Sequence, residues 1–80
     1  MGDVLKNYTI EIQTKVKLAL LNRENVYIDY NNETGSYVYS IGLESEPGFW
    51  LNAFKSKEAA EGFCRKHGLT IKNYYNNSFL

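Results

Sequence analysis

This 80-residue chain has few of the residue types on which catalysis and cross-linking depend, with one Cys, one His and one Pro. A single Cys excludes an internal disulfide, and one Cys with one His falls short of the ligand set of a structural zinc site. The sequence shows no apolar run long enough to span a membrane and no secretion signal. We therefore expect a soluble cytoplasmic protein with no cofactor, no metal and no membrane partner.

Net charge is also lacking, because nine Lys and Arg residues balance nine Asp and Glu residues. This removes the general attraction to nucleic acids or membranes that strongly basic proteins have. The charges are unevenly placed, however. The segment from Glu24 to Glu46 contains five acidic residues and no Lys or Arg. We expect this acidic segment to be attracted to a basic surface.

Length and composition predict a single domain over residues 1–80, with residues 1–7 and 76–80 frayed at its ends. Apolar residues make up 44% of the chain and charged residues 22%, which is typical of a folded protein. The expected class is α+β: a small antiparallel sheet of about four or five strands with one helix packed on one face. The favoured order of elements is β-β-β-β-α-β.

The first element is compatible with two structures. In residues 8–20, apolar and polar residues alternate as in a half-buried strand, and the Ile, Val and Thr content suits a strand. Extended to residues 4–21, the same segment carries a helical stripe that Asp3 could cap. We favour the strand, because a helix would leave Ile10 and Leu21 outside the apolar stripe. The alternative order is α-β-β-β-α-β, with residues 4–21 helical.

A hairpin follows, because two Tyr-rich and Val-rich segments flank the sequence NNETG, which has the composition of a turn. With a loop at residues 32–35, Tyr30 opposes Tyr37 and Ile28 opposes Tyr39. A shift by one residue would mix apolar and polar side chains, so the pattern itself favours one register. The buried face of the hairpin would carry Val26, Ile28, Tyr30, Tyr37, Tyr39 and Ile41, and the exposed face Tyr27, Asp29, Val38 and Ser40.

Residues 49–54 read as a further strand, and a helix with clear end signals follows. Ser56 can accept a hydrogen bond from an N–H group of the first helical turn. Gly68 can adopt the left-handed conformation that ends helices, and Leu69 can pack back onto the helix. Residues 69–74 then predict a short closing strand.

Two residue pairs are candidates for catalysis. Cys64 and His67 lie on one face of the predicted helix, an arrangement that a nucleophile and a base can adopt. Cys is also a common core residue, and the helix dipole favours a protonated His67 in the last turn. Glu44 and Glu46 precede Pro47 in a solvated loop, whereas acid–base chemistry needs a carboxyl in an apolar pocket. We predict no catalytic residues, no metal-binding residues and no enzyme activity.

Aromatic residues are abundant, with seven Tyr, four Phe and one Trp. A domain of this size cannot bury all of them, so some aromatic surface should remain for a partner. We predict a small non-enzymatic interaction module that binds another protein with a basic surface, of the kind that phages and mobile elements use to inhibit host restriction or CRISPR proteins. The expected binding residues are Tyr27, Asp29, Glu33, Glu44, Glu46, Trp50, Tyr74 and Tyr75.

Two further interpretations stay open. A nucleic-acid-binding domain would use the basic face of the predicted helix together with Trp50, and its binding would fall steeply as salt rises. A homodimer, in which an edge strand or the C-terminal tail completes the sheet of a second copy, is compatible with an interaction module.

Overall fold

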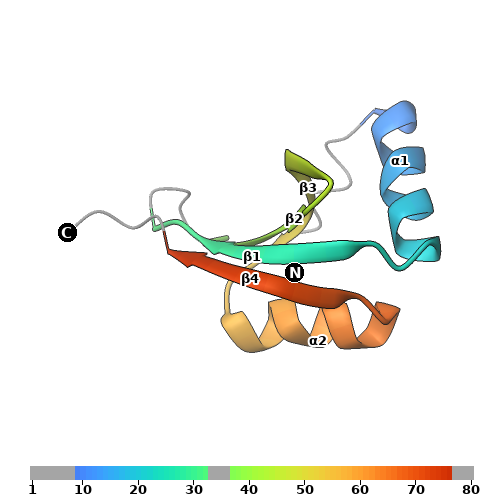
Figure 1. Cartoon of the computed structure of the whole chain (residues 1–80). Helices are drawn as coiled ribbons and strands as arrows, with labels where there is room; N and C mark the ends of the chain where they lie inside the picture. Colours follow the sequence, from blue (N-terminus) through green and yellow to red (C-terminus); the bar gives the residue numbers. More distant parts are fainter. Residues whose placement is uncertain (1–8, 33–36, 77–80) are drawn as a thin grey trace.

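The computed structural model describes residues 9–32 and 37–76 and shows a small α+β fold, as the sequence predicts (Figure 1). Its element order is the alternative one, α-β-β-β-α-β. The predicted frayed ends lie outside the described residues, except Asn76, which is the last residue of a strand. The elements are α1 (Ile10–Leu21), β1 (Asn25–Tyr30), β2 (Tyr39–Leu43), β3 (Glu46–Phe54), α2 (Lys57–His67) and β4 (Thr70–Asn76).

The four strands form one sheet in the order β3-β2-β1-β4. The pairs β1–β2 and β2–β3 are antiparallel, whereas β1 and β4 are parallel. The sheet is therefore mixed, and the prediction of a purely antiparallel sheet is corrected. Because α2 carries the chain back along the sheet after β3, β4 runs in the same direction as β3 and hence as β1.

The first element is a helix, so the favoured strand over residues 8–20 is wrong. α1 begins after Thr9, whose side-chain oxygen accepts a hydrogen bond from the backbone N–H of Ile12 at 3.2 Å. Val16 and Ala19 are buried in the core of the domain. The hydrogen bond to Thr9 is the N-terminal capping interaction that starts many helices. Asp3, which the sequence suggests as a cap, lies outside the described residues.

The two residues that argued against this helix remain in solvent. Ile10 is 75% exposed and Leu21 is 77% exposed. A helix satisfies its own backbone hydrogen bonds, whereas a strand needs a place beside another strand. The good helix formers of this segment, together with the burial of Val16 and Ala19, outweigh the exposure of these two side chains.

The β1–β2 hairpin has the predicted faces but a different register. Tyr30 pairs with Tyr39 and Ile28 with Ile41, so each β1 residue lies opposite a residue two places further along than predicted. An even shift preserves which side chains share a face. Ile28 and Ile41 are therefore both buried, as expected. The predicted loop at residues 32–35 lies largely outside the described residues.

The end signals of α2 are confirmed, and the helix covers one face of the sheet (Figure 1). The Ser56 hydroxyl accepts a hydrogen bond from the backbone N–H of Ala59 at 3.1 Å, and Gly68 has a φ angle of 69°. The strands predicted at residues 49–54 and 69–74 correspond to β3 and β4. The core between α1, α2 and the sheet consists of Val16, Ala19, Val26, Ile28, Ile41, Leu43, Leu51, Phe54, Ala60, Cys64 and Leu69.

Candidate functional site: an aromatic and acidic pocket

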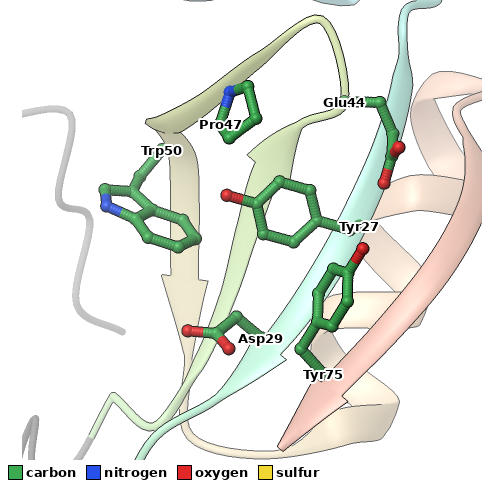
Figure 2. A pocket seen from close by; sticks show the side chains of 6 residues that line it. All are labelled: Tyr27, Asp29, Glu44, Pro47, Trp50 and Tyr75. Atoms are coloured by element: carbon green, nitrogen blue, oxygen red, sulfur yellow. The ribbon is translucent and has the colours of Figure 1, made fainter. Parts of the chain in front are cut away.

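The face of the sheet opposite α2 collects side chains from three strands. Side chains alternate between the two faces of a strand, so Tyr27 and Asp29 of β1 both point away from the core. The strand register places Tyr75 of β4 beside Asp29, and Trp50 of β3 opposite Gly42 of β2. Figure 2 shows the side chains of Tyr27, Asp29, Trp50 and Tyr75 gathered on this face.

A pocket of about 390 Å³ lies on this face. Five of the eight predicted binding residues line it, and Pro47 completes the lining. Neither Lys nor Arg is among the described residues that line it. The pocket therefore combines aromatic walls with two acidic groups, and its lining is Tyr27, Asp29, Glu44, Pro47, Trp50 and Tyr75 (Figure 2).

Tyr27 forms the floor of the pocket, because its ring lies across Gly42 of the neighbouring strand. A Cβ atom at Gly42 would come within 2.4 Å of Cζ of Tyr27, so only glycine leaves room for the ring. The phenol oxygen accepts a hydrogen bond from the backbone N–H of Gly48 at 3.2 Å. Tyr27 lies on the predicted face but is only 7% exposed, which corrects the expectation of a solvent-facing side chain.

Trp50 and Tyr75 lie on the two sides of Tyr27 (Figure 2). Their ring centroids are 5.7 Å and 5.3 Å from that of Tyr27, and their planes are inclined to it by 70° and 75°. Such edge-to-face contacts between aromatic rings are favourable. Trp50 is half-buried and Tyr75 is 48% exposed, so both rings retain surface that a ligand can contact.

Asp29 and Glu44 contribute two carboxyl groups at different ends of the pocket (Figure 2). Oε2 of Glu44 accepts a hydrogen bond from Nδ2 of Asn73 at 3.0 Å, and Glu44 is half-buried. Asp29 is only 8% exposed, which corrects the expectation of an acid on an open hairpin face. A carboxylate that is partly removed from water interacts more strongly with a cation than one on the open surface.

Three predicted binding residues are not part of this pocket. Glu46 is the first residue of β3 and forms a salt bridge with Lys15 of α1 at 2.6 Å, so tertiary contact brings a cation to the acidic segment. Tyr74 faces α2, where its hydroxyl donates a hydrogen bond to Oε2 of Glu61 at 2.5 Å. This bond favours the protonated phenol and raises the pKa of Tyr74 to about 12. Glu33 lies outside the described residues.

Two residues of the site were not predicted. The sequence places Pro47 in a loop and does not indicate that Gly42 belongs to the site. A glycine inside a strand often marks the close approach of another group, and this is the one signal in the sequence that points to Gly42. The group that approaches it is Tyr27, because the strand register places these two residues side by side.

Comparison of the chain with family models, with curated proteins and with solved structures finds no match. No helix in residues 9–32 and 37–76 is both long enough and apolar enough to cross a membrane. Because no match is found, the function is inferred from the geometry and chemistry of the site.

Cys64 and His67 do not show the features of a catalytic pair. Cys64 is 1% exposed and belongs to the core. Burial, followed by the negative charge of Glu61, raises the pKa of its thiol to about 11. A thiol with such a pKa is almost fully protonated near neutral pH and is a poor nucleophile. The ring of His67 lies 4.5 Å from that of Phe63, centroid to centroid.

Among the residues that the structure describes, no group of three or more His, Cys, Asp and Glu side chains could hold a metal ion. The absence of enzyme activity stays a prediction.

The basic residues around α2 are separated from Trp50. Lys55 and Lys66 line a second hollow of about 500 Å³, which lies beside α2. Lys57 also belongs to α2, and its Nζ lies 5.0 Å from the centroid of the Tyr74 ring. Trp50 lies in the pocket on the opposite face of the sheet. The set of residues expected for nucleic-acid binding is therefore divided between two faces.

Proposed function

We propose that this chain is a small non-enzymatic interaction module that binds a basic surface of another protein. Its contact surface is the pocket face, meaning the face of the sheet that carries Tyr27, Asp29, Glu44, Trp50 and Tyr75. The observation that carries the proposal is the composition of the pocket, where the lining residues within 9–32 and 37–76 include three aromatic and two acidic residues and no basic one. Trp and Tyr are enriched among the residues that dominate binding at protein interfaces.

Charge supports a basic partner. Asp29 and Glu44 belong to the pocket face, whereas Lys55, which precedes α2, and Lys66, which belongs to α2, lie on the other side of the sheet. A partner with a positive patch is steered to the acidic side, and the attraction weakens as salt rises. Proteins that handle nucleic acids present such patches in their binding channels. We further propose that the partner is a host protein that handles nucleic acids and that binding inhibits it. We place this interaction in the cytoplasm.

The test measures binding to purified proteins with basic channels, namely a restriction endonuclease and a CRISPR effector nuclease, both without nucleic acid. Wild-type protein is compared with Glu44→Lys, which reverses a charge in the pocket. The matched control is Glu58→Lys, which makes the same change at an exposed position of α2. We expect Glu44→Lys to weaken binding by at least about tenfold, because like charges then meet at the contact.

The same experiment names the results that contradict the proposal. If Glu44→Lys and Glu58→Lys weaken binding equally, then either the contact surface lies elsewhere or binding depends only on the net charge of the protein. Failure of both proteins to bind at low salt would remove the nucleic-acid-handling partner. Binding that survives saturation of the channel with DNA would show that the channel is not the surface recognised.

Direct nucleic-acid binding is the second candidate, and the exposed Lys55 and Lys66 beside α2 favour it. A gel shift at low salt would detect it, and the affinity would fall steeply with salt. Lys55→Glu and Lys66→Glu would abolish such binding, whereas Glu44→Lys would leave it unchanged or strengthen it. The two candidate functions are therefore distinguished by the location of the substitutions that weaken binding, which lie on the pocket face for one function and on the α2 side of the sheet for the other.

A further inference from the structure

The rings of Trp50 and Tyr75 meet the ring of Tyr27 edge to face and are not stacked on it. Tyr27 forms the floor across Gly42, and Trp50 and Tyr75 stand at 70° and 75° to it on its two sides (Figure 2). The face of an aromatic ring carries partial negative charge. Three rings with two carboxyl groups around one pocket therefore create a region of negative potential with apolar walls.

From this arrangement we infer that the pocket binds the cationic head of a single Lys or Arg side chain of the partner protein. The inference rests on the proposed function and names the chemistry of its central contact. A cation within about 6 Å of a ring centroid is attracted to the ring face, and aromatic cages recognise ammonium groups in this way. A neutral apolar ligand would instead take water away from the Asp29 and Glu44 carboxyl groups without bringing a positive charge, which is costly.

Contacts between lysines and aromatic rings already recur in this chain. Nζ of Lys15 lies 4.5 Å from the ring centroid of Phe49. The corresponding distance is 5.5 Å for Lys55 over the ring of Tyr37. Neither lysine is among the residues that line the pocket. Among residues 9–32 and 37–76, no Lys or Arg lines the pocket, so no described side chain supplies it with a cation.

The size of the pocket limits what the ligand can be. Its volume of about 390 Å³ is near the lower end of the range of roughly 300–1,000 Å³ that is usual for ligand sites. A pocket of this size admits one side-chain head with part of its aliphatic stem, which can lie along Pro47 and the ring of Trp50. A helix or a strand of a partner would remain above the rim.

The test uses the fluorescence of Trp50, which is the only Trp of the chain and lines the pocket. The full-length protein is titrated with choline and, in parallel, with 3,3-dimethyl-1-butanol, which has the same shape without the charge. Ionic strength is held constant with sodium chloride. We expect choline to change the Trp50 emission in the millimolar range and the neutral alcohol to leave it unchanged at the same concentrations.

Two pairs of matched variants locate the binding. Tyr75→Leu removes a wall of the pocket, and Tyr74→Leu makes the same change at the neighbouring residue, which is similarly exposed but faces α2. Glu44→Gln removes a pocket charge, and Glu58→Gln removes one from α2. We expect Tyr75→Leu and Glu44→Gln to weaken choline binding roughly threefold to thirtyfold, with both controls close to wild type. Circular dichroism confirms that each variant is folded.

Short peptides decide the source of the cation. Three peptides of one sequence carry a central Lys, Arg or trimethyl-lysine, and a fourth carries Gln as the uncharged control. Tighter binding of any of the charged peptides than of the Gln peptide supports the inference and ranks the side chains. Equal binding of all four peptides overturns it, as does equal binding of choline and the neutral alcohol.

The outcomes separate this inference from the proposed function. If choline and the charged peptides do not bind, but a basic protein binds and depends on Glu44, the cation cage is wrong and the interaction module stands. If choline binds in a manner that depends on Tyr75, but no basic protein binds the pocket face, the cation site stands and the protein partner is wrong.

Discussion

Gly42 lies beneath the ring of Tyr27, so replacing it with Ala tests whether this contact shapes the pocket. The added Cβ would lie 2.4 Å from Cζ, 2.6 Å from the phenol oxygen and 2.8 Å from Cε2 of Tyr27. Carbon atoms in contact are normally about 3.5–4.0 Å apart, so the ring has to move. Its edge-to-face neighbours Trp50 and Tyr75, and the hydrogen bond from Gly48, hold it in its present place.

The size of the effect follows from these contacts. Forcing an extra carbon into a well-packed site costs about 1–3 kcal/mol. Ala is intrinsically better than Gly inside a strand by roughly 0.5–1 kcal/mol, which offsets part of the cost. We expect Gly42→Ala to lower the free energy of unfolding by about 1–2 kcal/mol. Each kcal/mol corresponds to a fall in Tm of about 4–8 °C for a domain of this size.

Urea unfolding followed by Trp50 fluorescence measures this for four proteins: wild type, Gly42→Ala, Tyr27→Ala and the double variant. Without the Tyr27 ring, the three atoms that lie nearest to the added Cβ are gone. The same substitution should then be neutral or should stabilise the protein by up to about 1 kcal/mol. An equal cost of Gly42→Ala in both backgrounds would refute the reasoning, because the ring could not be its cause.

Four further predictions concern stability. Gly62→Ala in α2 should raise the free energy of unfolding by about 1 kcal/mol, because the new Cβ meets only a guanidinium nitrogen of Arg65 at 3.8 Å; a lower urea midpoint would contradict this. Gly68→Ala should lower that free energy by about 1 kcal/mol, since the φ angle of 69° is unfavourable for Ala; thermal unfolding measures it, and an unchanged Tm would be inconsistent with the cap. Because burial raises the pKa of Cys64 from 9.0 to about 11, the unfolded chain loses this proton first, and stability should fall as pH rises through that window. Urea unfolding of the wild type and of Cys64→Ala at a series of pH values in this window checks this. The free energy of unfolding of Cys64→Ala should depend less on pH, and identical pH profiles for the two proteins would contradict the role given to Cys64. Glu46→Gln should change stability by less than about 1 kcal/mol, because its salt bridge to Lys15 is exposed; a much larger loss in urea unfolding would show that α1 depends on this contact.

The parts of the fold that the sequence predicts are those with local causes. The start of α2 depends on the hydroxyl of Ser56, and its end depends on the left-handed conformation of Gly68. Both signals act within a few residues, so no knowledge of the rest of the chain is needed. The faces of the β1–β2 hairpin are likewise predictable, because side chains alternate along any strand.

α1 was mistaken because its local pattern fits two structures. Alternation in residues 8–20 favours a strand, and the same residues carry a helical stripe. The choice depends on how the segment packs against the rest of the domain, and as a helix it places Val16 and Ala19 in the core. This information lies outside the segment, so periodicity within it could not decide.

The candidate site was predicted as a set of residues but not as a pocket. Tyr27 and Asp29 were assigned to the correct face, yet both are buried there. Their burial depends on Trp50, which lies across β2, and on Tyr75, which the return through α2 brings beside β1. No pattern around Tyr27 indicates these two neighbours.

By itself, the sequence determined the α+β class, the caps of α2 and the side of the sheet on which each hairpin residue lies, because these follow from hydrogen bonding and geometry over a few residues. Only the tertiary structure decided that α1 is a helix and that β4 runs parallel to β1. It also decided that the rings of Tyr27, Trp50 and Tyr75 line one pocket together with two carboxyl groups. These outcomes depend on contacts between residues far apart in the chain, whose energies no local pattern contains.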